Sequence, residues 1–390
     1  MFSVLSSRRN PLKWVGFVFI SLILAACEPV GFGGGPLINT SKPIPVALLV
    51  PGGSENANDA LLASSLENAA RLAMADLDGV SIDLRVYNTS GVPEIAANAA
   101  REAANAGAKI ILGPVFAKNA AAVGIAVANR NINVLAFSNN TGVAGGNIFV
   151  LGPTFKNTAD RLVRYSLQQG RSNIMIVNGQ DGSEEIGRDA INRSILANGG
   201  SLAGITSFEL SQQGVIDAVS RIASDVKDSG AQSIFLTSGT SGALPLLAQL
   251  LPENGVDPMV TQYIGLQRWD IPATAISLGG LQGGWFAVPD PALSANFQGR
   301  YTAAYGSTPH PVAGLAYDGI AAIGALALSG QADALSRTAL TQPSGFVGVN
   351  GVFRLLADGT NERGLAVAQI QDNQVVVIDP APRGFGGTGF

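Results

Sequence analysis

Two adjacent stretches decide the fold, Val46–Gly53 (VALLVPGG) and Asp59–Leu77 (DALLASSLENAARLAMADL). An unbroken apolar run that stops at Pro-Gly-Gly is typical of a strand buried on both faces. The second stretch repeats apolar residues at helical spacing, at Leu62, Leu66, Ala69, Ala73 and Leu77. A buried strand followed at once by such a helix predicts a βαβ unit, in which the next strand runs parallel to the first.

The strand–helix alternation continues to about residue 150 and then starts again. In the first series we expect strands at 82–86, 110–112 and 134–137, and helices at 93–106 and 118–129. In the second series we expect helices at 157–169, 184–196, 214–228 and 241–251, and strands at 174–177, 202–208, 234–236 and 260–264. Alternation at this spacing is typical of parallel sheets with helices on both faces.

The chain is longer than a single core supports. Its 390 residues exceed the ~250–300 at which one core stops growing, so we expect two lobes. After an apolar run at 285–288, helices at 293–305 and 312–328 have no lobe of their own and are expected to return to the first one, before late strands at 352–356, 364–371 and 375–378. The predicted fold class is α/β with two Rossmann-like lobes. The predicted divisions are a signal peptide at 1–26, a tether at 27–45, a first lobe at 46–153 plus 286–345, a second lobe at 154–285 plus 346–379, and a tail at 380–390.

The N-terminus has the order of a secretory signal segment. Basic residues between positions 8 and 13 precede an apolar run at 14–26, which is shorter than the ~20 residues that span a bilayer as a helix. The residues that end this run, Leu-Ala-Ala followed by Cys27, resemble a bacterial lipobox, whose cysteine carries diacylglycerol after cleavage. Glu28 stands where aspartate favours retention in the inner membrane of enteric bacteria. We therefore expect a periplasmic protein with a lipid on Cys27, anchored in the outer rather than the inner membrane. The alternative is an ordinary signal peptide with an incidental cysteine.

Composition argues against several function classes. Hydrophobic residues make up 47% of the chain and charged residues 13%, which favours a large packed core over disorder. The net charge is −4 and the chain after the signal segment has no basic run, so nucleic-acid binding has no electrostatic support. The chain has one cysteine, Cys27, and one histidine, His310, which lies between two prolines. These numbers argue against thiol chemistry, a Ser-His-Asp triad and a metal site, so we predict no catalytic residues, no metal and no cofactor. Asp181, Glu184 and Glu185 are the nearest acidic cluster, and we interpret them as a solvated helix N-terminus rather than an enzymatic carboxylate pair.

An ordered set of stretches across residues 44–378 resembles the type I periplasmic binding proteins, in particular the branched-chain amino-acid branch. The stretches are VALLVPGG, LENAARLAMADL, AKIILGPVFAKNAAA, VLAFSNNT, NIMIVNGQDGSEEIGRDAI, YDGIAAIGALA and GVFRLLADGTNERGLAVAQIQ. The resemblance implies a cleft between lobes joined by three crossovers, near Val150–Thr154, Gly284–Val288 and Gly345–Leu355.

The loops that follow the strands are the candidate site, because ligands of parallel α/β sheets bind outside the carboxyl ends of the strands. These loops are rich in glycine and in hydroxyl and amide side chains: Gly52–Ser54, Val115–Lys118, Ser138–Thr141, Asn178–Ser183, Ser238–Ser241 and Gln267–Trp269. The alternative is that these residues serve turn geometry alone. The resemblance implies that a ligand carboxylate lies near the Ala117 backbone and near Ser138, Asn139 and Asn140.

The second lobe departs from the amino-acid-binding pattern. The position of the relatives' acidic residue, which holds the ligand ammonium, aligns near Gln267. The positions of their aromatic hydroxyls align near Ser183 and Thr240, where there is no ring. A buried ammonium without a counter-charge costs several kcal/mol. Asp181, Glu184 and Asp270 are the acids that offer a substitute.

Two functions follow from the resemblance. The first is a lipid-anchored solute-binding protein that delivers an amino acid or related small polar molecule to an ABC permease. The second is an outer-membrane lipoprotein that uses this fold to activate a penicillin-binding protein. The incomplete ammonium clamp and a late segment with Gly348, Gly351, Phe353 and Arg354 fit the second. The two-lobe layout with polar loops after the strands favours the first, which we place slightly ahead. An enzyme is the weakest of the three classes considered.

Overall fold

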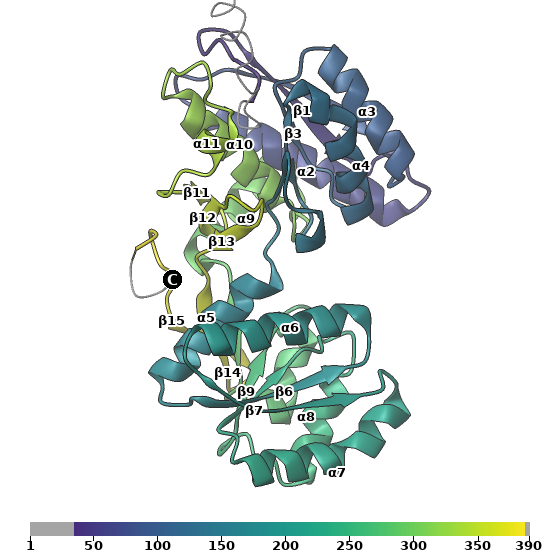
Figure 1. Cartoon of the computed structure of the whole chain (residues 1–390), viewed down its shortest axis with the longest axis vertical. Coiled ribbons are helices and arrows are strands. Elements are labelled where there is room, and N and C mark those ends of the chain that lie inside the picture. The colour runs from purple at the N-terminus through teal and green to yellow at the C-terminus, as the bar shows by residue number, and fades with distance from the viewer. Residues whose placement is uncertain (1–34, 387–390) are drawn as a thin grey trace, which may run out of the picture.

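The computed structural model describes residues 35–386, which form two α/β lobes stacked one above the other (Figure 1). The first lobe is built on a parallel sheet in the order β2-β1-β3-β4-β5. Its strands are β1 (Ile44–Val50), β2 (Ile82–Asn88), β3 (Ile110–Leu112), β4 (Asn133–Ala136) and β5 (Ile148–Val150). Its helices are α2 (Ala57–Ala75), α3 (Pro93–Asn105), α4 (Ala117–Val127), α9 (Pro291–Tyr305), α10 (Gly314–Ala327) and α11 (Arg337–Leu340).

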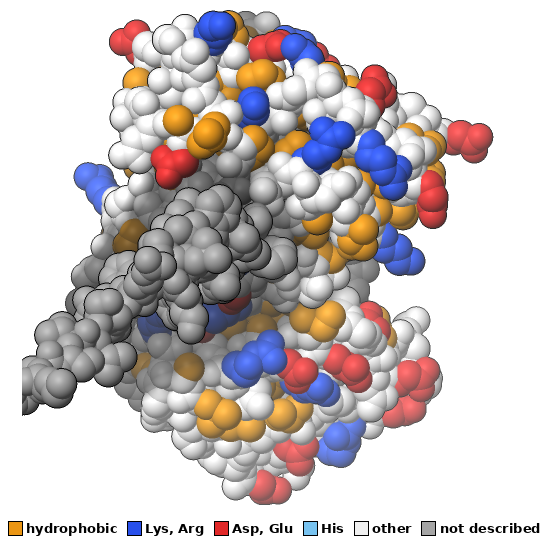
Figure 2. Space-filling model, turned by 45° about the horizontal axis from the view of Figure 1, so that its top comes forward, with side chains coloured by type: hydrophobic (Ala, Val, Ile, Leu, Met, Phe, Trp, Pro, Cys, Tyr) orange, Lys and Arg blue, Asp and Glu red, His pale blue; other side chains and the backbone are white. Residues whose placement is uncertain are grey.

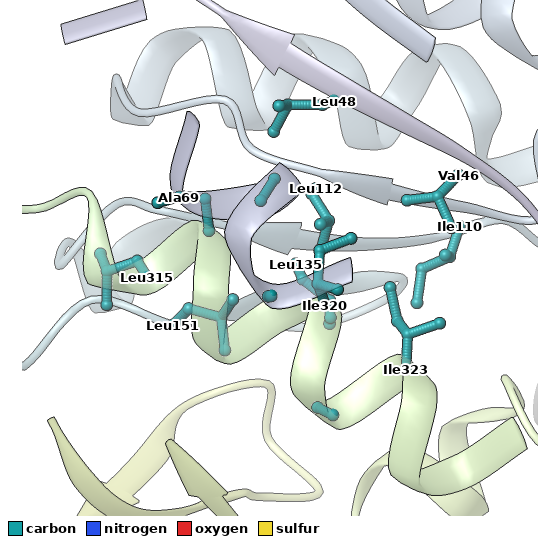
Figure 3. Packing of buried hydrophobic residues seen from close by; sticks show 14 of the residues in the cluster. Val46, Leu48, Ala69, Ile110, Leu112, Leu135, Leu151, Leu315, Ile320 and Ile323 are labelled. Atoms are coloured by element: carbon teal, nitrogen blue, oxygen red, sulfur yellow. The ribbon is translucent and has the colours of Figure 1, made fainter. Parts of the chain in front are cut away.

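Strand β1 supplies side chains to the cores on both faces of this sheet. Val46, Leu48 and Val50 belong to the core that α2, α9 and α10 cover, and Ala47 and Leu49 belong to the core that α3 and α4 cover. Figure 3 shows α10 presenting its isoleucines to the strand residues of the first core. Burial on both faces explains why the opening run of the sequence has no polar position.

The second lobe is built on a sheet in the order β15-β14-β10-β9-β8-β6-β7. Its strands are β6 (Asn173–Gly179), β7 (Ser201–Phe208), β8 (Ser233–Leu236), β9 (Gln262–Gly265), β10 (Trp285–Val288), β14 (Ala366–Gln371) and β15 (Gln374–Asp379). The strands from β6 to β10 pair in parallel, and β14 and β15 are added antiparallel at one edge. Helices α5 (Phe155–Gln168) and α6 (Gly182–Ala197) cover one face, and α7 (Gln212–Ser229) and α8 (Leu244–Glu253) cover the other.

The late part of the chain is divided between the lobes differently from the sequence expectation. A small antiparallel sheet of β11 (Phe346–Gly348), β12 (Gly351–Leu355) and β13 (Asn361–Arg363) packs on the first lobe, because the rings of Phe346 and Phe353 are buried in its core. The expectation that 346–379 belongs as one piece to the second lobe is therefore wrong for β11, β12 and β13. Only β14 and β15 complete the second sheet, so the third crossover lies between β13 and β14 rather than at 345–355. The second crossover follows β10, which pairs within the second sheet, and the first lies between β5 and α5.

A buried ion pair fixes the third crossover to the first lobe. The Arg363 guanidinium lies 3.1 Å from the Asp318 carboxylate of α10, and both side chains are almost fully buried, at 4% and 0% exposed. Arg363 also donates two hydrogen bonds to the Leu151 carbonyl, at 2.9 and 2.5 Å, and the Val349 amide donates to Asp318 at 2.8 Å. Burial raises the pKa of the Asp318 carboxyl, an effect that Arg363 and the Val349 amide oppose. The first and third crossovers are thereby tied together at one point.

A second set of bonds ties the same crossovers to the second lobe. Asn361 donates to the carbonyls of Val150 and Gly152, at 2.7 and 2.9 Å, and accepts through its own carbonyl from Asn157 of α5 at 2.9 Å. Arg161, also on α5 and 5% exposed, donates to the Leu365 carbonyl at 2.7 Å. The hinge between the lobes is therefore built from hydrogen bonds whose partners lie about two hundred residues apart in the sequence.

Candidate functional site

The carboxyl ends of the parallel strands in each lobe face the other lobe. In the first lobe β5 leads directly into α5 of the second, and in the second lobe β10 leads directly into α9 of the first. Because the other parallel strands run in the same direction as β5 or β10, their following loops also face the gap. On the part of the face that Figure 2 leaves uncovered, acidic and basic side chains are interspersed on both lobes.

On the first lobe, the loop after β4 is polar and locally ordered. Ser138 is buried, and its hydroxyl accepts a hydrogen bond from the Asn140 amide at 3.1 Å. The Asn140 side chain accepts from the Gly142 amide at 2.8 Å and caps the short helix Thr141–Val143. Asn139 is exposed. Ala117 is the first residue of α4, after an N-cap whose side chain makes no capping bond, so its backbone amide lies in the first turn, where helix amides lack intrahelical partners.

On the second lobe, a buried carboxylate joins two of the loops. Glu184, 6% exposed, accepts hydrogen bonds from the Gly179 amide at 2.6 Å, from the Thr237 hydroxyl at 2.8 Å and from the Ser238 hydroxyl at 2.8 Å. All of these donors are neutral, and none of the ion pairs formed within residues 35–386 includes Glu184. The buried carboxylate of Glu184 thus holds together the loops that follow the carboxyl ends of β6 and β8.

The other acids of this region already have local partners. Asp181 caps α6 by accepting from the Glu184 amide at 2.7 Å. Asp270 forms an ion pair with Arg268 at 2.5 Å. The interpretation of these acids as a solvated N-terminus of α6 therefore holds for Glu185, which is exposed. It does not hold for Glu184, which is buried and accepts hydrogen bonds from two hydroxyls of the β8 loop.

Gln267 and Thr240 are fixed by backbone groups. The Gln267 amide nitrogen donates to the Thr237 carbonyl at 3.0 Å, and its other end lies so close to Gly239 that a methyl group there would collide with it. The Thr240 hydroxyl donates to the Ile271 carbonyl at 2.6 Å. At the position that aligns with the relatives' acidic residue, the structure therefore has a neutral amide, whose nitrogen donates to the Thr237 carbonyl.

Two cavities open at these loops. One, of about 220 Å³, is lined from both lobes, by Asn139, Asn140, Thr141, Phe155, Lys156, Ser183, Ile186, Ala190 and Arg193. The other, of about 510 Å³, lies on the second lobe and is lined by Asp181, Ser183, Glu184, Leu210, Gly239, Thr240, Ser241, Gly242, Gln267, Arg268 and Ile271. Ser183 lines both, so the cavities adjoin along the first turn of α6.

These cavities sort the residues expected from the sequence. The first brings together Asn139, Asn140 and Ser183, and the second brings together Asp181, Ser183, Thr240 and Gln267, while Ala117 and Ser138 line neither. Sequence reasoning did not place Lys156, Arg193 or Leu210 at the site. Arg193 lies ten residues beyond Ser183 on α6, so only the helical period of that segment could have indicated that they share a side.

A larger cavity lies elsewhere. It has a volume of about 1020 Å³ and is lined by the start of α7, by α8 from Pro245 to Pro252 and by residues 278–280, with Leu210, Leu246 and Leu278 among the apolar side chains. It belongs to the second lobe alone, whereas the 220 Å³ cavity is lined by residues of both lobes.

Within residues 35–386, no group of three or more His, Cys, Asp or Glu side chains is arranged to hold a metal ion. No helix in that part of the chain combines the length and the apolar character needed to cross a membrane.

Comparisons with known proteins agree with this geometry. A family model described as periplasmic binding protein matches residues 43–374. Among solved structures, a putative branched-chain amino acid ABC transporter protein from Rhodospirillum rubrum has a TM-score of 0.73 at 17% identity, over 86% of this chain and 100% of that one. A branched-chain amino acid ABC transporter periplasmic ligand-binding protein from Burkholderia xenovorans has a TM-score of 0.69 at 19% identity, over 88% and 97%. An ABC transporter substrate-binding protein from Desulfitobacterium hafniense, solved with Leu, has a TM-score of 0.63 at 16% identity, over 86% and 100%. No curated protein matches the chain.

Proposed function

Because the chain belongs to the periplasmic binding protein family, we propose that it captures an amino acid or related small polar molecule between its lobes and presents it to an ABC permease. The observation that carries this proposal is the 220 Å³ cavity, whose lining comes from the β4 loop of the first lobe and from α5 and α6 beyond the crossover. A solute held there contacts both lobes, so its binding favours the arrangement in which they are closed.

The polar groups of the two loops suit a small zwitterion. The first lobe offers the amide side chains of Asn139 and Asn140. In the adjoining 510 Å³ cavity, the second lobe offers Glu184, whose charge has no cationic partner among the ion pairs described above, and Thr240. Polar groups that converge from two sides of a cavity fix the orientation of a ligand, and a buried carboxylate favours a ligand nitrogen that carries positive charge.

Thermal unfolding of the full chain against amino acids, amides and short peptides tests the proposal. A ligand at 100 times its Kd adds ~2.7 kcal/mol to the free energy of unfolding. At roughly 2–4 °C per kcal/mol, the melting temperature should rise by about 5–10 °C. Replacing Asn139, which lines the 220 Å³ cavity, by alanine should reduce the shift, whereas the same change at the exposed Asn98 of α3 should leave it intact. If no solute shifts the transition, the transport proposal is rejected.

We also propose that Cys27 carries a lipid that anchors the protein to the outer membrane. Cys27 lies outside the described residues, so the support is the signal-like order of the N-terminus. Two or more acyl chains are needed for stable attachment. Labelled palmitate should be incorporated into the wild-type chain and not into Cys27→Ala. Density-gradient separation of the two membranes should place the labelled protein with the outer one, and label that persists in the variant would reject the anchor.

A second candidate function, activation of a penicillin-binding protein, is favoured by one observation. Gln267, which aligns with the acidic residue of amino-acid-binding relatives, is a neutral amide bonded to the Thr237 carbonyl. A fold that lacks an acidic residue at this position can act through its outer surface instead of through a bound amino acid. Crosslinking in cells followed by mass spectrometry separates the two proposals. Recovery of a permease supports transport, and recovery of a peptidoglycan synthase without a permease supports activation.

A further inference from the structure

The last described residues return from the second lobe to the first. Strand β15 ends at Asp379 at the edge of the second sheet, and the chain then passes the hinge on the left of Figure 1 toward the small sheet of β11, β12 and β13. Its two ends are held by different lobes. This segment, residues 379–386, is called the C-terminal strap below.

The strap is held to the second lobe at its start. Arg161 of α5 forms an ion pair with Asp379 at 2.6 Å and donates to the Pro380 carbonyl at 3.3 Å. The same guanidinium holds the third crossover through the Leu365 carbonyl at 2.7 Å. Ala381, 9% exposed, belongs to the core of the second lobe. The start of the strap and the crossover beside it therefore move with α5.

The other end of the strap is held by the first lobe. The Phe385 ring lies over the Arg354 guanidinium of β12, 4.6 Å from its centre, which is within the range of a cation–π interaction. Arg354 is itself fixed by an ion pair with Glu362 at 2.6 Å. Gly345 leaves the space that the ring uses, since a methyl group there would lie 2.6 Å from the ring edge. Phe385 thus occupies a notch between Gly345 and Arg354 on the first lobe.

Between these anchors the strap covers the hinge. Pro382 lies against Gly364, where an added methyl group would come within 3.0 Å of the proline carbonyl. Gly364 is the residue at which the chain passes from β13 toward β14, so Pro382 lies on the third crossover itself. From Ala381 to Phe385 the chain is four residues long and spans about 13–14 Å at most when fully extended. A larger separation of the two anchors requires Phe385 to leave its notch.

We propose that the C-terminal strap is a fourth connection between the lobes, which restricts their rotation about the crossovers as long as Phe385 is docked on Arg354. The three crossovers are continuous chain and cannot detach. The strap is held on the first lobe by non-covalent contacts, so it can release and dock again. The proposal depends on the two-lobe hinge and not on which solute or partner protein binds.

Pulsed electron paramagnetic resonance on the full chain tests the proposal. Spin labels are placed at Leu61→Cys on α2 and Ile216→Cys on α7, both exposed, with Cys27→Ser to remove the native thiol. Docking predicts a narrow distribution of inter-lobe distances in this parent. Phe385→Ala should broaden the distribution and displace its mean. Val375→Ala, on the exposed edge strand β15 that precedes the strap, should leave it unchanged.

A distribution for Phe385→Ala that coincides with that of the parent overturns the proposal. An equal change in Val375→Ala also overturns it, because the effect would then belong to strand β15. Circular dichroism establishes that each variant is folded. If Phe385→Ala does not fold, Arg354→Met removes the cation under the ring instead, and the same broadening is expected of it.

Discussion

Replacing Arg363 by methionine tests whether the buried ion pair of the hinge holds the first lobe together. The substitution keeps an extended apolar side chain but removes the guanidinium that faces Asp318, whose side chain is 0% exposed. Asp318 then keeps the Val349 amide at 2.8 Å, while the Leu151 carbonyl loses both of the bonds that Arg363 donated. A buried charge is left without its counter-charge, and a buried acceptor is left without these donors.

The burial of the ion pair determines how much free energy of unfolding Arg363→Met should lose. Removing one partner of a buried ion pair costs about 3–5 kcal/mol, because the remaining charge stays desolvated. For a lobe of roughly 200 residues this corresponds to a fall in melting temperature on the order of 10 °C. A matched control is Arg354→Met on the neighbouring strand, whose ion pair with Glu362 has side chains 29% and 27% exposed. Partly solvated pairs contribute about 1 kcal/mol or less, so the control should lose far less.

The loss of stability in Arg363→Met should also become smaller as the pH falls. Burial raises the pKa of Asp318, and removing Arg363 raises it further, so the folded variant binds a proton more tightly than the unfolded chain does. The cost is therefore largest at neutral pH and shrinks as the pH falls through the raised pKa toward the unfolded value of about 3.9. Thermal unfolding of the parent, Arg363→Met and Arg354→Met, followed by circular dichroism between pH 7.5 and 4, measures this. Equal losses in the two variants, or a loss in Arg363→Met that grows on acidification, would refute the reasoning.

Three further predictions concern single side chains. Glu184→Ala leaves three donors without their acceptor and should cost about 2–3 kcal/mol in urea unfolding, while Glu185→Ala, at the exposed next position, should stay within about 0.5 kcal/mol. Burial lowers the pKa of His310, so the unfolded chain takes up a proton first and stability falls as the pH drops through about 6.5; His310→Gln should flatten stability between pH 7 and 5, and an unchanged slope would contradict this. Gly348→Ala places a methyl group against the buried aspartate carboxylate and should lower the melting temperature clearly, whereas Gly204→Ala in β7, with open space around it, should not; equal effects would contradict the packing argument.

The periodic parts of the fold could be predicted because their signals are local. Residues 46–50 are apolar throughout since they alternate between two cores, and the helix after them shows its buried side in the spacing of Leu62, Leu66 and Ala69. Strands β11 and β13 could not be predicted in this way, because neither is an unbroken apolar run like Ile110–Leu112: β11 ends in glycine and β13 is polar throughout. Their assignment to the first lobe depends on Phe353 in its core and on the Arg363–Asp318 pair, which are tertiary contacts.

For the candidate site, the position of the loops could be predicted, but the partners of most of their side chains could not. That the loops after the strands face the gap follows from parallel pairing, and the sequence indicates those loops by glycine and small polar residues. The state of each side chain within them depends on partners that are distant in the sequence. Glu184 resembles an ordinary acid in the first turn of a helix until the hydroxyls of Thr237 and Ser238, more than fifty residues away, bury it. Asp270 is the exception, because its partner Arg268 lies only two residues before it.

The division of the chain between the lobes has a consequence for how the protein folds. The helices and the five parallel strands of the second lobe come from one continuous stretch, 155–288, so most of its contacts form as soon as that stretch is available. The first lobe begins at β1 but needs α10, which packs in its core against the residues of α2, and later still the rings of β11 and β12. Contacts of such sequence separation form slowly, because long loops must close first. During synthesis from the N-terminus, the apolar side chains of β1 and β3 therefore stay partly exposed until segments near the other end of the chain have been made. The lobe that begins first is completed last, and its early strands are where a holding chaperone would bind.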